Sequence, residues 1–324
     1  MRYRELGRTG LRVSEIGIGA WGIGGVMIVN GRANSYGPAD DAEGIRMIQW
    51  GLDQGINFVD VAPAYGFGHS EELVGQALKG RRDKVILETK VGEHFVDGQQ
   101  LWRFDPPFVR AAIDESLTRL QTDYIDSYVL HLPSRGGVST EQALAAIETA
   151  RASGKVRFAG ASIYSDQQGV ELAESGRCDV IQQMVNLLEP QSAQAFLPTA
   201  AQHGVGVVAR QVIYKGFLTD AVTRDTTFDP TDLRSRYSKD DLRALFDRID
   251  EFSFLWEDDK RRRIESAIQY ALSLPAVGTV ICGALTQQEL ADAVAAGDAA
   301  PFTDEEIARV ADIQQRQLAA AVAH

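Results

Sequence analysis

The chain has 324 residues, of which 44% are hydrophobic and 24% are charged, and its formal net charge is −12. This length suits one large α/β barrel or two smaller domains, and the apolar fraction is sufficient for a sizeable core. The acidic balance argues against nonspecific binding to nucleic acid. One basic run, Arg261–Arg263, follows three acidic residues and is interpreted as the solvated start of a helix.

The number of cysteines and the hydropathy of the chain indicate in which cellular compartment the protein works and whether it binds a metal. Cys178 and Cys282 lie far apart without CxxC spacing, so the sequence predicts neither a disulfide framework nor a metal site. The start, MRYRELGRTGL, lacks the apolar core of a signal peptide, and no run approaches the roughly 18 apolar residues of a membrane span. We expect a soluble, cytoplasmic protein with no membrane association.

Short, nearly continuous apolar runs alternate with helical patterns, which is typical of parallel strands covered on both faces. The predicted strands are Ile16–Gly19, Asn57–Asp60, Val85–Val91, Ile125–His131, Val156–Ser162, Val180–Val185, Val205–Arg210 and Val277–Cys282. The predicted helices between them include Asp40–Gln54, Ser70–Leu78 and Phe108–Leu120, and two more that begin at Thr140 and Ser165. This α/β order predicts one (β/α)8 TIM barrel domain over residues 1–324, with a doubly wound sheet as the alternative.

Two segments lie outside this repeat. Arg2–Val13, with its Gly-Arg-Thr-Gly turn, predicts an N-terminal β-hairpin before the first barrel strand. Leu218–Asp259 is a long, partly helical loop after strand seven. Long loops in compact domains are usually functional or disordered, and this one is large enough to cover a pocket.

Ionisable residues follow three neighbouring strands where each one ends. Asp60 ends strand two with Tyr65 close behind, Lys90 ends strand three, and His131 ends strand four. The active site of a (β/α)8 barrel forms at the carboxyl ends of its strands, so these side chains should converge. Taken singly they have structural explanations: Asp60 and Lys90 could be an ion pair that seals the barrel, and His131 a core histidine.

At these residues the sequence resembles the aldo-keto reductase superfamily over essentially its whole length. The resemblance implies hydride transfer between a nicotinamide cofactor and a carbonyl or alcohol carbon of a small molecule, by a monomer or homo-oligomer. The blocks that carry it are GINFVDVAPAYGFGHSEELVGQAL (Gly55–Leu78), RRDKVILETKVG (Arg81–Gly92), SLTRLQTDYIDSYVLH (Ser116–His131), GKVRFAGASIYS (Gly154–Ser165) and DVIQQMVNLLE (Asp179–Glu189).

The residue types fit these implied roles. Tyr65 is the expected general acid for reduction and general base for oxidation. A nearby ammonium, Lys90, favours tyrosinate and should lower the pKa of Tyr65. Asp60 would hold Lys90, and His131 would orient the carbonyl oxygen and donate a hydrogen bond as charge develops.

The resemblance also implies a nicotinamide dinucleotide, NADP(H) by the family pattern, across the barrel mouth. Gly17, Gly19 and Gly22 form a Gly-x-Gly-x-x-Gly, but no helix follows directly, so they are not read as a dinucleotide fingerprint. The expected cofactor contacts are Ala20, Trp21, Ser162, Gln182, Arg210, Gly216, Leu218, Gly283, Leu285 and Glu289.

Five positions depart from the family pattern, one of them Ala293, which stands where many members have an Asn on the helix after strand eight. Ile163 stands where an Asn usually follows the serine, and Arg210 replaces a tyrosine that stacks on the nicotinamide; a guanidinium can also stack, but it disfavours the cationic ring. Leu285 and Glu289 replace groups that hold the adenosine 2′-phosphate, so NAD(H) stays open beside NADP(H). Arginines of the long loop could supply the missing charge: Arg224, Arg234 and Arg236.

Two other functions stay open at this point. The first is a non-redox enzyme on the same fold, such as an epimerase or lyase that retains its cofactor. The second is a regulatory protein similar to potassium-channel β subunits, which would bind a partner without turnover. Both are compatible with the four strand-end residues.

Overall fold

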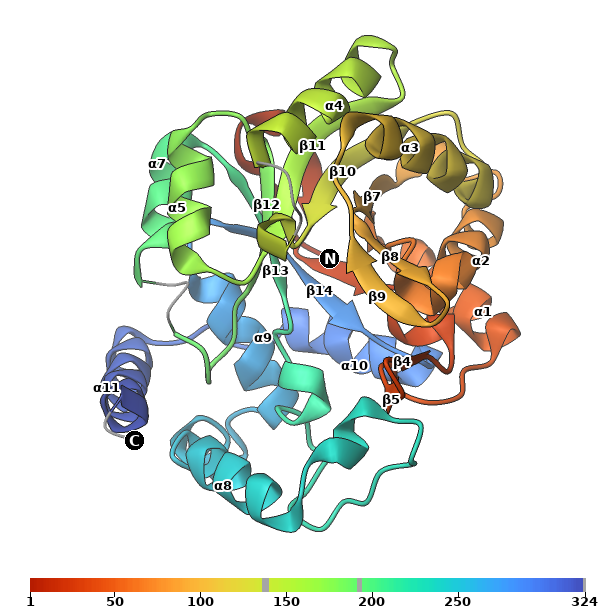
Figure 1. The fold of residues 1–324 in the computed structure, drawn as a ribbon. Coiled ribbons are helices and arrows are strands. Elements are labelled where there is room, and N and C mark those ends of the chain that lie inside the picture. Colours follow the sequence, from red (N-terminus) through yellow and green to blue (C-terminus); the bar gives the residue numbers. More distant parts are fainter. Residues whose placement is uncertain (136–139, 191–193, 323–324) are drawn as a thin grey trace.

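The computed structural model describes residues 1–135, 140–190 and 194–322. Eight parallel strands close into a barrel, in which β3 pairs with β14 and β6, and β10 pairs with β7 and β11 (Figure 1). This confirms the (β/α)8 barrel, and the doubly wound alternative is wrong. The barrel strands are β3 (Ile16–Gly19), β6 (Phe58–Asp60), β7 (Ile86–Val91), β10 (Ile125–His131), β11 (Val156–Ile163), β12 (Val180–Met184), β13 (Gly206–Arg210) and β14 (Val277–Gly283).

Most of the helices surround the barrel and pack their apolar faces on its outer surface (Figure 1), whereas Lys239–Asp250 and Asp304–Val322 pack in a separate cluster. Asp40 accepts the Glu43 N–H and caps α1, and Asp105 likewise caps α3, which begins with two prolines at positions that need no N–H partner. The helices are α1 (Asp41–Asp53), α2 (His69–Ala77), α3 (Pro106–Leu120), α4 (Thr140–Ala152), α5 (Asp166–Glu174), α7 (Phe196–His203), α8 (Lys239–Asp250), α9 (Arg263–Ser273), α10 (Gln287–Gly297) and α11 (Asp304–Val322).

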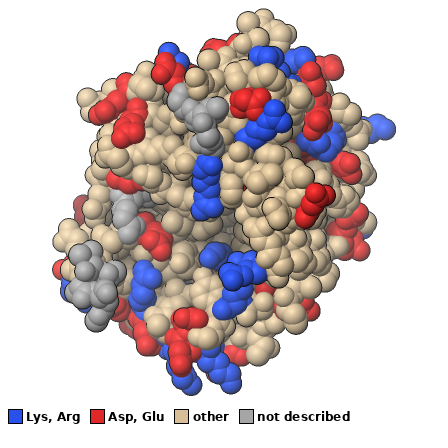
Figure 2. Space-filling model, viewed as in Figure 1, with Lys and Arg blue, Asp and Glu red and all other residues tan. Residues whose placement is uncertain are grey.

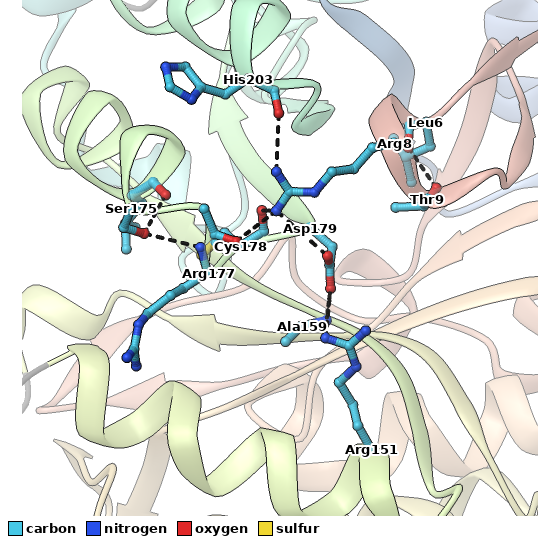
Figure 3. A network of polar contacts seen from close by, with 12 residues as sticks. Leu6, Arg8, Thr9, Arg151, Ala159, Ser175, Arg177, Cys178, Asp179 and His203 are labelled. Carbon is cyan, nitrogen blue, oxygen red and sulfur yellow. Dashed lines mark hydrogen bonds and ion pairs between the residues drawn. The ribbon is translucent and has the colours of Figure 1, made fainter.

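The predicted N-terminal hairpin is confirmed, as β1 (Tyr3–Glu5) paired with β2 (Arg12–Ser14). It closes the amino end of the barrel, where Leu6 is fully buried. From the turn, Arg8 donates to the carbonyls of His203 at 3.1 Å and Cys178 at 3.0 Å, and it lies 3.8 Å from Asp179 (Figure 3). This end of the barrel is therefore sealed by structural contacts, and the opposite end is the place for a site.

Two short hairpins that the sequence analysis did not predict lie at the carboxyl ends of the strands (Figure 1). They are β4–β5 (Ile28–Val29 and Arg32–Ala33) and β8–β9 (Glu93–Val96 and Gln99–Trp102). Their turns touch, because the Asn30 N–H donates to the Gly98 carbonyl at 3.2 Å.

The long loop after β13 forms a second apolar cluster outside the barrel. Phe217 is fully buried there against α8, and the cluster includes residues of α9 and α11. The loop therefore packs as an ordered wall beside the mouth. In the described part of the chain, no helix is both long and apolar enough to cross a membrane.

Candidate active site

A cleft of about 660 Å³ opens at the carboxyl ends of the barrel strands. This volume falls within the range of about 300–1,000 Å³ that small-molecule sites occupy. Figure 2 shows the hollow near the centre of this face, with Lys and Arg side chains gathered around it. The lining of the cleft itself holds both signs of charge, because carboxylates lie among these basic side chains.

Three of the four strand-end residues line this cleft, namely Asp60, Tyr65 and His131. Lys90 lies behind them with no exposed surface, and its ammonium donates to Asp60 and, at 3.0 Å, to the Val61 carbonyl. Burial lowers the pKa of Lys90, but the charge of Asp60, together with the other acidic groups around the ammonium, outweighs burial and raises that pKa above its ordinary value. Lys90 is therefore a fixed positive charge beneath the floor of the cleft.

Tyr65 is placed by a glycine contact between two loops. Gly66 has φ +60, and a Cβ there would lie 2.4 Å from the Gly24 oxygen, so neither loop could approach as closely with a side chain. The start of α2 is fixed as well, because Ser70 Oγ donates to the Ala20 carbonyl at 2.6 Å. These contacts hold the Tyr65 loop against the end of β3.

The phenol of Tyr65 lies between Lys90 and His131. Lys90 Nζ is 4.9 Å from the centre of the Tyr65 ring, and the His131 ring meets it edge-on at 6.2 Å. The expectation that the pKa of Tyr65 is lowered is wrong for this structure, because burial raises it well above its ordinary value. Lys90 acts in the expected direction but does not overcome burial, so Tyr65 holds its proton at neutral pH.

A second carboxyl group, Glu88, lies in the barrel beside Asp60 and was not predicted. It has no exposed surface, accepts a hydrogen bond from Ser127 at 2.6 Å, and accepts another from Gln182 at 2.7 Å. Burial, followed by the charge of Asp60, raises the pKa of Glu88 to about 7. Gln182 uses both amide hydrogens on these two carboxyl groups, since it also donates to Asp60 at 2.7 Å.

The raised pKa of Glu88 makes stability depend on pH. The ordinary pKa is 4.5, so the folded protein binds more protons than the unfolded chain between pH 4.5 and about 7. The free energy of unfolding should therefore fall as pH rises through this window, by about 1–3 kcal/mol. Glu88→Gln keeps the shape and removes the titration. We expect urea unfolding to show that fall in the parent protein and a flatter profile in the variant; parallel profiles would contradict it.

His131 has a partner that the sequence analysis missed. Its Nδ1 lies 2.9 Å from Oε2 of Glu93, the first residue of β8, and Gln100 on β9 donates to the other oxygen of the same carboxylate. The unpredicted β8–β9 hairpin therefore supplies a contact to one of the four predicted site residues.

Left-handed backbone is concentrated around the cleft. Leu132 directly follows His131 with φ +57, and Gln211 directly follows Arg210 with φ +54. Such conformations cost about 1–3 kcal/mol each in residues other than glycine and tend to occur where a site needs them. Both turn the chain sharply at the end of a barrel strand, which leaves the preceding side chain at the mouth.

The expected cofactor residues are largely brought together. Two do not line the cleft, because Ala20 and Leu218 are fully buried behind it. Gln182 lines it, but its amide donors are already used, so only its oxygen, which already accepts from Ser162 at 3.0 Å, could accept a further hydrogen bond from a bound amide. The cleft does include Trp21, Ser162, Gln182, Arg210, Gly216, Gly283, Leu285 and Glu289.

The surroundings of Arg210 show whether a nicotinamide ring could fit beside it in the cleft. Its guanidinium donates to the Ile163 carbonyl at 2.7 Å and lies 4.2 Å from the centre of the Tyr164 ring. Its Nε is buried and has no hydrogen-bond partner within the described structure. A flat, fixed cation with an unused donor fits a planar amide-bearing ring, so this part of the site is compatible with the cofactor.

The end of the cleft away from Tyr65, lined by Leu285 and Glu289, carries carboxylates beside one arginine that is already paired. We call it the far end. Glu289 accepts the Leu285 N–H at 2.7 Å, and Arg262 is paired with Asp292 at 2.8 Å and with Glu265 at 2.7 Å. The basic run does lie at the start of a helix, as expected, because α9 begins at Arg263, and Arg262 is exposed at the rim of the cleft. Arg261 is the exception, since it is buried and paired with Glu306.

The loop arginines do not supply a free charge here. Arg224 pairs with Asp247 and Asp250 outside the cleft, and Arg236 donates to the Ala33 carbonyl outside it. Arg234 lines the cleft, but it is already paired with Asp232 at 2.7 Å.

Comparisons with known proteins agree with this geometry. A sequence profile of the Aldo/keto reductase family matches residues 15–315. Aldo-keto reductase YhdN of Bacillus subtilis is 32% identical over 290 residues, which cover 88% of this chain and 85% of that protein. The NADH-specific methylglyoxal reductase of Escherichia coli is 28% identical over 312 residues, covering 91% and 93%. The structure of glycerol dehydrogenase AKR11B4 from Gluconobacter oxydans is 31% identical with a TM-score of 0.83, covering 97% and 95%.

The barrel, its cleft and these relatives define a (β/α)8-barrel oxidoreductase. The chain belongs to the aldo/keto reductase family. Members of this family use NAD(P)H and act on small carbonyl compounds.

Proposed function

We propose that the protein is an NADH-preferring carbonyl reductase that also oxidises the corresponding alcohol, with Tyr65 as its general acid and base. The observation that carries this proposal is the convergence of Tyr65, His131 and the buried Asp60–Lys90 pair at one end of the cleft. The four residues come from three barrel strands and the loop after β6, so a purely structural ion pair does not account for the phenol and imidazole beside it.

The chemistry of these side chains supports reduction at neutral pH. When bound, the nicotinamide supplies the hydride that reaches the carbonyl carbon. Negative charge then develops on the carbonyl oxygen, and Tyr65, which keeps its proton because burial raises its pKa, donates that proton. Lys90 stabilises the phenolate that remains, and Asp60 keeps Lys90 in place.

The preference for NADH rests on the far end of the cleft. By the family pattern this end holds the adenosine, and a 2′-phosphate there would meet Glu289 and Asp292. Arg262 is already paired with Asp292, so little free positive charge remains for a phosphate. The similarity to an NADH-specific reductase of Escherichia coli supports the same preference.

Titration of the protein with each cofactor, followed by fluorescence quenching, tests this preference. We expect NADH to bind at least about tenfold more tightly than NADPH, a difference of about 1.4 kcal/mol. The double variant Glu289→Gln/Asp292→Asn should tighten NADPH binding relative to NADH binding. Asp298→Asn, at the opposite end of α10, is the matched control. A strong preference of the parent protein for NADPH would contradict the proposal.

Absorbance at 340 nm separates the other two functions from this one. Consumption of added NADH with an aldehyde or ketone supports the reductase. A cofactor that co-purifies and is not consumed would instead indicate an epimerase or lyase. Binding of a partner protein without any turnover would indicate a regulatory subunit.

A further inference from the structure

The β8–β9 hairpin carries Glu93 into the mouth of the barrel. Between Lys90 and Glu93 the chain turns at Gly92, which has φ +118 and whose Cβ would lie 1.9 Å from the Phe104 ring. Glycine is therefore required for this turn. Glu93 itself is 8% exposed, and its Oε2 lies 2.9 Å from Nδ1 of His131.

The carboxylate of Glu93 is ionised and fixed on both sides. Burial opposes its ionisation, but the hydrogen bonds that its two oxygens make with His131 and Gln100 favour the carboxylate, and the pKa of Glu93 lies below its usual value. Gln100 donates to Oε1, which leaves Oε2 for His131. Glu93 is therefore an acceptor at neutral pH and has no proton to offer.

The contact with Glu93 limits where the imidazole of His131 can carry hydrogens. Because an ionised carboxylate only accepts, Nδ1 of His131 must carry a hydrogen. A neutral imidazole has one N–H, so its Nε2 would then be an acceptor and would repel a carbonyl oxygen. Only the imidazolium can bond Glu93 through Nδ1 and also donate from Nε2 to a substrate oxygen.

We propose that Glu93 is a positioning residue that holds His131 as an imidazolium, with its Nδ1–H bound to Glu93 and its Nε2–H available to the carbonyl oxygen. This inference rests on the proposed function, since it concerns how the same site binds a carbonyl. A charged donor makes a shorter and roughly twice as strong hydrogen bond as a neutral one, and the gain grows as charge develops on the oxygen. Tyr65 remains the source of the transferred proton.

The other charges around His131 make Glu93 necessary. Tyr65 faces the ring edge-on and is neutral, and behind it Lys90 adds a positive charge that Asp60 partly cancels. Arg135, beyond the end of β10, lines the same cleft and adds another positive charge. Within the described chain, Glu93 is the carboxylate paired with His131, so it offsets this repulsion of an imidazolium.

Glu93→Gln separates charge from position, because the amide oxygen can still accept the Nδ1–H of His131. We expect kcat/KM for carbonyl reduction to lose its alkaline limb about one pH unit earlier, hence about tenfold lower activity above that limb. The Kd for NADH should not change. Glu72→Gln is the matched control, since Glu72 lies beside His69 on the surface and outside the cleft.

Histidine NMR provides a readout that does not depend on turnover. The chain has five histidines, and loss of one resonance in His131→Asn assigns His131. In the parent protein at neutral pH the His131 ring should carry hydrogens on both nitrogens, and in Glu93→Gln it should carry one, while the signals of His69 and His203 stay unchanged. If neither the pH–rate profile nor this signal moves, the proposal is overturned. If the His131 signal changes but the parent protein reduces no carbonyl compound, the proposed function is wrong, while the effect of Glu93 on the charge of His131 is supported.

Discussion

Tyr65→Phe should lower kcat for carbonyl reduction by about 10²- to 10⁴-fold, the usual contribution of a positioned general acid. The substitution removes only the hydroxyl, and the ring keeps its contacts with His131 and with Trp21, 6.2 Å away. Cofactor affinity and the free energy of unfolding should therefore stay close to those of the parent protein. Stopped-flow measurement of NADH oxidation isolates the chemical step from product release.

Tyr128→Phe is the matched control for this experiment. Tyr128 on β10 also has a buried phenol whose pKa burial raises well above its ordinary value, but it does not line the cleft. Its replacement should leave kcat unchanged. Equal loss of activity in the two variants would mean that the Tyr65 hydroxyl is not the proton donor.

The barrel and the convergence of the four strand-end residues were predictable because both depend on local pattern. A barrel strand buried on both faces is a short apolar run, and parallel strands bring their carboxyl ends to one side. The predicted and observed bounds of Ile16–Gly19 and Ile125–His131 agree, and the other strands differ by about a residue at their ends. Such differences arise because the last ladder bonds depend on the neighbouring strand, which local sequence does not specify.

The turn sequences of both unpredicted hairpins could have been recognised from the sequence alone. Asn30-Gly31 and Asp97-Gly98 are two-residue turns with positive φ at both positions, as a type I′ hairpin turn requires. The flanking strands are too short and too polar to show clear alternation, which hid the signal. Recognition of the Asp-Gly turn would have placed Glu93 on a hairpin beside the mouth.

From the sequence one can predict only whether each neighbouring charge raises or lowers the pKa of a site residue, and not the net shift. Glu88 and Lys90 are two residues apart on one strand and so face the same side, which a period-two pattern gives. The extent of burial was not accessible from sequence, and burial decides the net shift at Tyr65 and Glu88. The contact of Glu93 with His131 joins separate elements and depends on the final tertiary geometry.

Asp60→Asn should destabilise the fold by about 3–5 kcal/mol, because it removes the carboxylate bonded to the buried ammonium of Lys90 and leaves only Glu88 as a nearby counter-charge. Lys90 has no exposed surface, and its other hydrogen-bond acceptor is the neutral Val61 carbonyl. Lys90→Met should cost a similar amount, since the Asp60 carboxylate would then lie beside Glu88 with only Gln182 donating to it. Urea unfolding at pH 7 measures both losses.

The double variant Asp60→Asn/Lys90→Met removes both charges, and we expect most of the lost stability to return. Paired burial costs both ions their hydration, so an uncharged pair of similar volume is often equally stable. The double variant should nevertheless be as inactive as Lys90→Met, because in both variants no ammonium remains beneath Tyr65 to stabilise the phenolate. If stability returns but activity does not, the buried ion pair is needed for the proton transfer by Tyr65 and not for folding. If the double variant is as unstable as either single variant, the ion pair is needed for folding.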